Sequence, residues 1–234
     1  MKILSWNILA EEYIKKIYYK EIPKNILFNR NNRIKSIISV ITKFNCDIIT
    51  LQEVMLKEFN ELKKIFSIEY NIIKGKNINW NGCKGYSGNV TFIKKGTEIM
   101  EVIDHDYGVT TIISKNGKKI IVINIHLDDK NQLKRTEEIN SLKYLFSDIV
   151  IIAGDFNEHF NRKELSKLYK SFKSFEITNN SNTYYLEPMC IDNIIVKGFK
   201  TFKTTVINDF KTDYTKQFIN YGSDHLPLVG KMKL

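Results

Sequence analysis

Residues 148–157 read DIVIIAGDFN and contain the longest apolar run of the chain, which ends at a glycine, an aspartate and an asparagine. Five consecutive apolar residues (149–153) bounded by polar ones are typical of a strand that is buried on both faces. Gly154 and the residues after it are typical of a turn. The segment therefore predicts a buried strand whose end carries Asp155 and Asn157.

The same arrangement recurs along the chain, with polar residues at the ends of other apolar runs. Strand ends that meet at one edge of a sheet are where folds commonly place their sites. Taken singly, each position has a simpler explanation, such as a turn, a helix start, a core histidine or a surface ion pair. Together they predict one shared site, and the five strand ends are Asn7 after residues 2–6, Gln52 and Glu53 after 47–51, Asn124 and His126 in 119–126, Asp155 and Asn157 after 148–153, and Ser223, Asp224 and His225 before 226–232.

The remaining pattern indicates an α/β protein. Apolar residues at helical spacing predict helices around 34–41, 59–66 and 139–146, with a short fourth helix around 165–172. Further strands are predicted at 70–73, 89–94, 109–114, 191–196 and 201–207, with a hairpin turn at Asn116 and Gly117. The order favours two packed sheets with helices outside them. No linker or repeat interrupts it, so we expect one catalytic domain over residues 1–234.

Composition limits the class of protein. The chain has 234 residues, of which 43% are hydrophobic and 26% charged, as in globular proteins. Its longest apolar run is far shorter than the ~20 residues that cross a bilayer, and the N-terminus lacks a signal-peptide pattern. The three cysteines form no CxxC pair, so we expect a reducing, intracellular location. The net charge of +10 is compatible with a nucleic-acid partner, but equally with lysines spread over a solvated surface.

The residue types at the strand ends favour metal-assisted hydrolysis of a phosphate ester. Glu53 with Asn7 or Asp224 offers the hard oxygen ligands that suit Mg²⁺ or Mn²⁺. Asp155 beside an asparagine can orient a water and accept its proton. A histidine near carboxylates can contact an anionic oxygen, as charge developing on a phosphoryl group requires. The sequence contains no nucleophile elbow, P-loop or dinucleotide-binding glycine fingerprint.

Six motifs in chain order resemble a known superfamily, the endonuclease/exonuclease/phosphatase group of metal-dependent phosphodiesterases. The resemblance spans residues 2–234 and implies a four-layered α/β sandwich, in which two facing mixed β-sheets are flanked by helices and the site lies at one edge of both. The motifs are Ser5-Trp6-Asn7, Leu51-Gln52-Glu53-Val54, Asn124-Ile125-His126-Leu127, Gly154-Asp155-Phe156-Asn157, Ile191-Asp192 and Ser223-Asp224-His225-Leu226-Pro227.

The resemblance also implies a role for each matching residue. Glu53 is expected to be the main metal ligand, with Asn7 close by and Asp224 contributing. Asp155 is expected to activate the attacking water, and Asn157 to orient that water or the phosphate.

Three further roles concern protons and the phosphate group. Asp192 is expected to hold His225 in the correct tautomer, so that His225 binds the phosphoryl oxygen. His126 is expected to be a second phosphate contact. Asp192 is found only through the motif, since on its own it is equally well explained as a carboxylate at a strand edge.

Two branches of the superfamily are similar to different parts of the chain. Residues 6–11 (WNILAE) with Asn29, Arg30 and Arg33 resemble the deadenylase, nocturnin and angel group. Residues 70–75 (YNIIKG) and 92–96 (FIKKG) resemble the 5′-tyrosyl-DNA phosphodiesterases. The implied activity is hydrolysis at a nucleic-acid end, either at the 3′ end of RNA or at a 5′-tyrosyl linkage. The alternative is a small molecule or lipid headgroup, as in the sphingomyelinase and inositol-phosphate phosphatase branches.

Three residues are candidates for substrate binding. Arg135 follows the His126 motif ahead of a predicted helix, as in several branches. Trp80 and Tyr86 lie in a lysine-containing loop, where rings can stack on the bases of a single strand while lysines contact its phosphates. The same stretch also fits a solvated hairpin loop. We expect RNA or DNA as the partner, no membrane, and a monomer.

Overall fold

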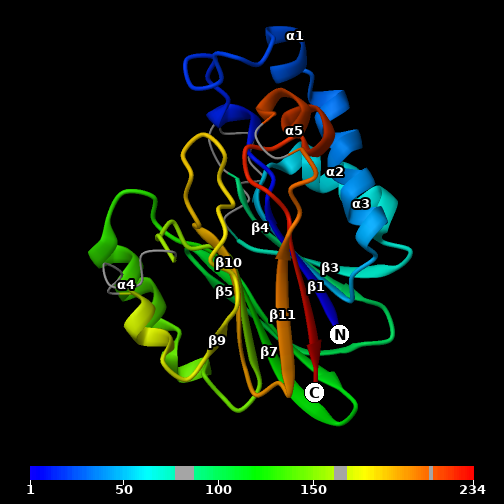
Figure 1. The fold of residues 1–234 in the computed structure, drawn as a ribbon. Coiled ribbons are helices and arrows are strands. Elements are labelled where there is room, and N and C mark those ends of the chain that lie inside the picture. Colours follow the sequence, from blue (N-terminus) through cyan, green and yellow to red (C-terminus); the bar gives the residue numbers. More distant parts are fainter. Residues whose placement is uncertain (77–86, 161–167, 211–212) are drawn as a thin grey trace.

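Two six-stranded mixed sheets form the centre of the part of the protein that the structure describes (Figure 1). The structure is a computed structural model, and residues 77–86, 161–167 and 211–212 lie outside its described residues. The first sheet has the order β11-β12-β1-β2-β4-β3 and the second the order β5-β6-β7-β8-β10-β9. The strands of the first sheet are β1 (Lys2–Asn7), β2 (Ile48–Val54), β3 (Tyr70–Lys74), β4 (Gly88–Lys94), β11 (Thr201–Val206) and β12 (Leu228–Lys233). Those of the second are β5 (Glu98–His105), β6 (Gly108–Lys115), β7 (Lys118–His126), β8 (Val150–Asp155), β9 (Glu176–Ile177) and β10 (Asp192–Lys197).

Each sheet has one parallel pair of strands at its middle. In the first sheet β1 pairs with β2, and the register places Asn7 opposite Gln52. In the second sheet β7 pairs with β8, and His126 lies opposite Asp155. Since β1 contacts β8 and β2 contacts β7, the carboxyl ends of all four strands meet at one edge of the packed sheets.

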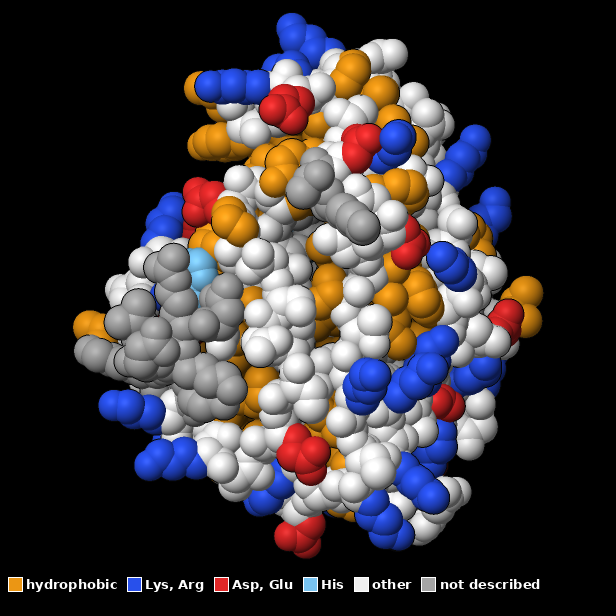
Figure 2. Space-filling model, in the orientation of Figure 1, with side chains coloured by type: hydrophobic (Ala, Val, Ile, Leu, Met, Phe, Trp, Pro, Cys, Tyr) orange, Lys and Arg blue, Asp and Glu red, His pale blue; other side chains and the backbone are white. Residues whose placement is uncertain are grey.

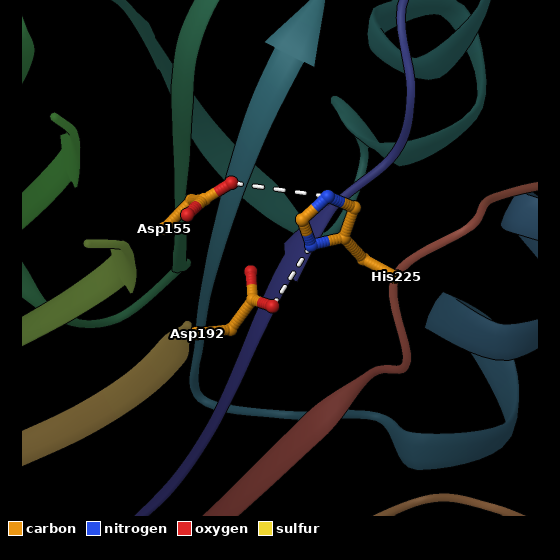
Figure 3. A group of neighbouring side chains, drawn as sticks. All are labelled: Asp155, Asp192 and His225. Atoms are coloured by element: carbon orange, nitrogen blue, oxygen red, sulfur yellow. Dashed lines mark hydrogen bonds and ion pairs between the residues drawn. The ribbon is translucent and has the colours of Figure 1, made fainter. Parts of the chain in front are cut away.

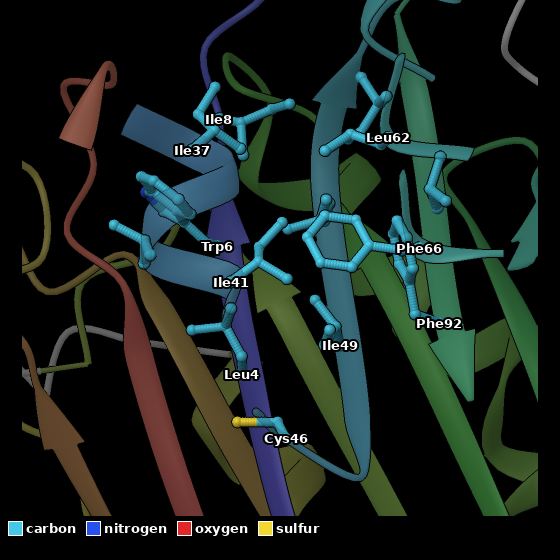
Figure 4. Packing of buried hydrophobic residues seen from close by; sticks show 14 of the residues in the cluster. Leu4, Trp6, Ile8, Ile37, Ile41, Cys46, Ile49, Leu62, Phe66 and Phe92 are labelled. Atoms are coloured by element: carbon cyan, nitrogen blue, oxygen red, sulfur yellow. The ribbon is translucent and has the colours of Figure 1, made fainter. Parts of the chain in front are cut away.

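Apolar side chains fill the space between the sheets and the space outside each of them. Ile3, Ile48 and Ile151 belong to a buried cluster that joins residues of both sheets. Outside the first sheet lie α2 (Arg30–Phe44) and α3 (Leu56–Phe66). Figure 4 shows residues of both helices packed against this sheet. Outside the second sheet lie α4 (Gln132–Ser141) and the short 3₁₀ helices η2 (Lys143–Leu145) and η3 (Leu168–Phe172). The result is the four-layered sandwich that the motifs predicted.

The predicted strands and the first two predicted helices are confirmed, with small shifts at their ends. The helix expected around 139–146 instead begins at Gln132, because Asn131 caps it by accepting hydrogen bonds from two backbone N–H groups. The expected fourth helix is the 3₁₀ helix η3 in its described part. The hairpin turn at Asn116 and Gly117 is present, and both residues have the positive φ that such a turn requires.

The elements that were not predicted are β5, the two-residue β9, the 3₁₀ helix Glu11–Tyr13, α5 (Tyr214–Tyr221) and the short α1 (Lys24–Leu27). β5 is an edge strand with charged residues on its exposed positions, so it lacks a continuous apolar face. The α5 helix buries only three residues, too few for a strong periodic signal. In the described part of the chain, no helix is long and apolar enough to span a membrane.

The Asp47 carboxylate, one residue before β2, connects both sheets at the end opposite the strand ends described above. Its Oδ2 accepts a hydrogen bond from the backbone N–H of Lys2 (2.7 Å), and its Oδ1 lies 3.1 Å from the Nζ of Lys115 on β6. Burial opposes ionisation of Asp47. The N–H of Lys2 and the ammonium of Lys115 favour the ionised carboxylate more strongly than burial disfavours it, so the pKa of Asp47 is lowered below 3.8.

We expect Asp47→Asn to reduce the free energy of unfolding by about 1 kcal/mol at neutral pH, because it removes a charge-assisted hydrogen bond and an ion pair. A group whose pKa is lower in the folded state than in the unfolded state stabilises the fold fully at pH values above its unfolded-state pKa. This stabilisation is lost as the pH falls through its folded-state pKa. The difference between wild type and variant in urea denaturation should therefore shrink below about pH 4. Asp106→Asn, at the exposed ion pair with Lys76, is the control and should leave stability unchanged. An equal difference at pH 7 and pH 3 would contradict the explanation.

Candidate active site

Six elements bring polar side chains together at the shared edge of the sheets. Asn7, Glu53 and Asp155 come from the ends of β1, β2 and β8, and all three are buried. Asp192 begins β10 and is also buried. Asp224 and His225 come from the segment between α5 and β12, and His126 ends β7 with 26% of its side chain exposed. We call these seven residues the carboxylate cluster.

His225 is held between two aspartates (Figure 3). Its Nδ1 lies 2.8 Å from Oδ2 of Asp192, and its Nε2 lies 3.8 Å from Oδ2 of Asp155. Burial opposes protonation of the ring, but the charge and hydrogen bond of Asp192 outweigh it and raise the pKa of His225 well above 6.5. The geometry therefore favours an imidazolium whose Nδ1–H donates to Asp192 and whose Nε2–H faces Asp155.

Asp155 lies at the centre of the cluster. Its Oδ1 accepts a hydrogen bond from the backbone N–H of Asn157 (2.9 Å), and its Oδ2 accepts one from Nδ2 of Asn7 (3.0 Å). The Nε2 of His126 is 3.7 Å from the same oxygen. Burial and the nearby Asp192 carboxylate raise the pKa of Asp155 above 3.8. A carboxylate with a raised pKa is a stronger proton acceptor than an ordinary aspartate.

Glu53 is aimed into the cluster by an irregularity in β2. A register shift between Leu51 and Val54 marks a β-bulge, and Glu53 has a φ of 57°, in the left-handed region. Its Oε1 accepts from Nδ2 of Asn7 (2.8 Å) and its Oε2 accepts from the N–H of Ala10 (2.8 Å). Backbone strain of this kind costs about 1–3 kcal/mol and persists where the surrounding structure enforces it.

Asp224 carries an unsatisfied oxygen atom. Its Oδ2 accepts a hydrogen bond from the hydroxyl of Tyr19 (2.8 Å), whereas its Oδ1 is buried, forms no hydrogen bond with the described residues and has the Nε2 of His225 at 4.0 Å. Burial raises the pKa of this carboxyl. Buried polar atoms without partners are rare in proteins and call for an explanation such as a bound ion.

The cluster fits a divalent cation. It places four carboxylates together and has only two histidines to offset their charge, and the unsatisfied oxygen of Asp224 is one ready ligand atom. Oxygen ligands of this type suit Mg²⁺ or Mn²⁺. Asp155, Asp192 and His225 have ligand atoms within 4.8 Å of one another. Both ring nitrogens of His225 already face carboxylates, Nδ1 that of Asp192 and Nε2 that of Asp155, so the residues that could hold the ion are Glu53, Asp224 and Asn7.

Asn157 and Gly154 shape the turn after β8. Asn157 has a φ of 48° and donates a hydrogen bond from Nδ2 to the carbonyl of Leu127 (2.9 Å), which fixes the direction of its side chain. Gly154 has a φ of 149°, and a Cβ there would lie 1.9 Å from the carbonyl oxygen of Ile125. Only glycine lets β8 approach β7 closely enough to place Asp155 in the cluster.

Arg135 lies outside the carboxylate cluster in this structure. It is on α4, where its Nε lies 2.9 Å from Oε2 of Glu158 and its Nη1 donates to the carbonyl of Asp128 (3.0 Å). An anionic substrate would have to compete with Glu158 for this guanidinium. Trp80 and Tyr86 lie outside the described residues, so their predicted role in binding stays a prediction.

Three further residues contact the cluster or its loops, and of these the sequence indicated only Arg33, through its resemblance to the deadenylase group. Tyr19 donates to Asp224, and the ring of Tyr184 lies 5.0 Å from the ring of His225. The buried guanidinium of Arg33 donates to the carbonyls of Ile8, Leu9 and Gly222, which joins the segments after β1 and before β12. Both tyrosines lie in irregular segments without periodicity. Arg33 offered a signal, because it is a charged residue one position before an apolar helix stripe.

The fold is a four-layered α/β sandwich, and the shared edge of its two sheets carries the carboxylate cluster. The model of the Endonuclease/Exonuclease/phosphatase family matches residues 4–225, so the chain belongs to this family, whose members are hydrolases acting on phosphoester bonds. This confirms the superfamily indicated by the six motifs. No curated protein matches the sequence.

Solved structures with the same fold cover nearly the whole chain. The endonuclease/exonuclease/phosphatase from Bacteroides vulgatus has a TM-score of 0.75 and 16% identity, and the match covers 100% of this chain and 98% of that chain. D. rerio TDP2, complexed with a single-strand DNA product, has a TM-score of 0.70 and 17% identity, with 100% and 99% covered. ANGEL2, described as a 2′,3′-cyclic phosphatase, has a TM-score of 0.77 and 15% identity, with 99% and 94% covered. At these identities the likeness establishes the fold.

Gly154→Ala should lower the free energy of unfolding by about 3 kcal/mol or more, because the new methyl group collides with backbone and the residue is strained at positive φ. Gly96→Ala is the matched control. Gly96 also has a positive φ (87°), but nothing lies within 4 Å of its Cβ position, so only the strain of about 1 kcal/mol is expected. Urea denaturation of both variants measures the difference, and equal losses would show that the approach of β8 to β7 does not require glycine.

Metal binding can be measured without turnover. A ligand present at about 100 times its Kd stabilises a fold by about 2.7 kcal/mol, so Mn²⁺ or Mg²⁺ should raise the Tm of the wild type by roughly 5–10 °C. Glu53→Gln removes a charged ligand and should need a much higher metal concentration for the same shift. Glu69→Gln, at an exposed position after α3, should behave like the wild type. A full shift in Glu53→Gln would remove Glu53 from the ligand set.

Proposed function

We propose that the protein is a divalent-metal-dependent phosphodiesterase that hydrolyses a phosphodiester at a nucleic-acid end. The observation that carries this proposal is the arrangement around His225. The imidazole of His225, whose Nδ1 lies 2.8 Å from Asp192, directs Nε2 toward Asp155 beside an oxygen-rich cluster. An imidazole donor and a carboxylate base beside residues that could hold a metal match what phosphoryl transfer to water needs.

Each residue of the cluster then has a defined task. Glu53, Asp224 and Asn7 would hold a divalent metal ion, which would supply Lewis-acid stabilisation of the charge that develops on the phosphoryl oxygens. Asp155 accepts the proton of the attacking water, for which its raised pKa suits it.

The histidines and Asn157 act on the phosphate itself. His225 donates a hydrogen bond from Nε2 to a phosphoryl oxygen, and Asp192 keeps the proton on Nδ1. His126, which is partly exposed at the mouth of the site, contacts a second oxygen. Asn157 orients the water or the phosphate from its fixed position after β8.

A nucleic-acid end is the substrate class that we favour. The net charge of +10 favours a polyanionic substrate. Among proteins of this fold, TDP2 is found with a single-strand DNA product and ANGEL2 is described as a 2′,3′-cyclic phosphatase. The two leading substrates are the 3′ end of RNA, as in the deadenylase-like branch, and a 5′-tyrosyl-DNA linkage.

Asp155→Asn should abolish turnover with little loss of stability, because it keeps the shape of the side chain and removes the proton acceptor. The assay uses an internally labelled oligonucleotide with a 5′-phosphotyrosine and a 3′ adenosine tract, together with a second oligonucleotide that ends in a 2′,3′-cyclic phosphate. Both are incubated with Mg²⁺ and either the wild type or the variant.

The products distinguish the substrates. Loss of tyrosine at intact length supports the 5′-tyrosyl activity, a ladder that shortens from the 3′ end supports the exonuclease, and opening of the cyclic phosphate supports an end-healing activity. If neither oligonucleotide is cleaved but a generic phosphodiester is hydrolysed, the proposed nucleic-acid substrate is contradicted and a small-molecule substrate is supported. Wild-type rates in Asp155→Asn would overturn the mechanism.

A further inference from the structure

A groove lined by tyrosines lies next to the carboxylate cluster. It has a volume of about 570 Å³ and runs between residues 17–22 and residues 184–187, with α5 along one side. Five of its lining residues are tyrosines, of which Tyr19 and Tyr185 are buried, namely Tyr18, Tyr19, Tyr184, Tyr185 and Tyr214. We call it the tyrosine groove. Its volume is within the range of sites that bind small organic groups, about 300–1,000 Å³.

The tyrosine groove is joined to the site by two direct contacts. The Tyr19 hydroxyl donates to Oδ2 of Asp224 (2.8 Å). The ring of Tyr184 lies 5.0 Å from the imidazole of His225, and the two backbones form an isolated β-bridge. A group in the groove is therefore adjacent to a phosphate bound at His225.

The walls of the groove are fixed by aromatic packing. Tyr185 stacks on Tyr214 with ring centres 5.1 Å apart and an interplanar angle of 19°, and Tyr19 packs against Phe218 at 6.1 Å. A wall held in this way loses little conformational freedom when a ligand binds.

At its outer end the groove leaves large apolar side chains in solvent. Ile17 is 67% exposed and Tyr18 is 60% exposed. Figure 2 shows hydrophobic side chains gathered on the surface at the upper end of the molecule, where α1 lies in Figure 1. Large apolar side chains exposed beside the groove are available for contact with a bound ligand.

The charges of the groove argue against an anionic occupant. Its lining includes one basic residue, Lys20, and two acidic ones, Glu21 and Glu187. A phosphate or an anionic headgroup would face a net negative lining there, whereas a neutral ring would not. Tyrosine faces stack on planar aromatic groups, and stacking on a nucleobase is sequence-tolerant.

We propose that the tyrosine groove binds an unpaired nucleobase of the nucleotide attached to the scissile phosphate. This inference rests on the proposed function, since it names the part of the substrate that lies next to the phosphate bound at His225. Tyr18 is then a substrate-binding residue at the outer end of the groove, and Tyr184 joins the base position to His225.

Binding, measured apart from turnover, tests the inference. The probe is a fluorescein-labelled hexamer of riboadenylate, titrated with Asp155→Asn protein in Mg²⁺ and followed by fluorescence anisotropy. A series of hexamers carries one abasic residue at each position in turn. Stacking of one base corresponds to roughly a 10-fold change in Kd, so we expect one abasic position to weaken binding by about that factor.

The variants connect that position to the groove. Tyr18→Ala in the same background should weaken binding of the intact hexamer roughly 10-fold and should leave the sensitive abasic hexamer unchanged. Tyr18→Phe keeps the ring and should bind like the parent protein. Tyr144→Ala removes a tyrosine that is 72% exposed on η2, outside the groove, and serves as the matched control.

The outcomes separate this inference from the proposed function. Equal binding of all abasic hexamers, or equal losses in Tyr18→Ala for intact and abasic probes, would overturn the groove as a base site. Cleavage of oligonucleotides by the wild type would then still support the proposed function. If binding depends on the base and on Tyr18 but the wild type cleaves no oligonucleotide, the result would support base binding in the groove and contradict the proposed activity.

Discussion

Two buried side-chain amides hold the sheets at the spacing that the carboxylate cluster requires. Asn124 of the second sheet donates to the carbonyls of Leu51 and Val90 in the first, and its Oδ1 accepts from Gln52. Asn7 of the first sheet donates to Asp155 of the second. A buried amide left without partners costs about 1–3 kcal/mol, so both distance and register between the sheets are fixed by these bonds. The carboxylates lie directly beyond them, and their geometry follows from this contact.

The same edge also collects the unfavourable features of the structure. Burial raises the pKa values of Asp155 and Asp224, which means that folding disfavours their ionised forms. Leu9, Glu53 and Asn157 each adopt a positive φ within this edge. Strain and buried charge of this kind reduce stability, and packed apolar residues would serve the fold better. Strained backbone and buried carboxylates that gather at one edge are typical of a functional site rather than of a region that only stabilises the fold.

The sequence predicted the layers and the strand ends that come together at one edge, because apolar periodicity and strand ends are local signals. It could not predict what depends on contacts between sheets. The bulge that turns Glu53 inward has no local pattern, and Asn124 has the same signature as the cluster residues although its side chain joins the sheets instead. Asp192 begins a strand rather than ending one, so only the family motif revealed it. Tyr19 and Tyr184 lie in irregular segments whose positions are set by tertiary contacts.

In the proposed mechanism the two sheets provide different groups, and His225 connects them. In the proposed mechanism Glu53 of the first sheet holds the metal, while Asp155 and Asp192 of the second manage protons. His225 precedes a strand of the first sheet, yet its Nδ1 bonds to Asp192 of the second. The rigid frame therefore fixes the chemistry, and the irregular segments beside it are left to select the substrate. Tyrosines of the groove contact both Asp224 and His225. The free energy of binding a base in the groove would therefore help to position the phosphate relative to the attacking water.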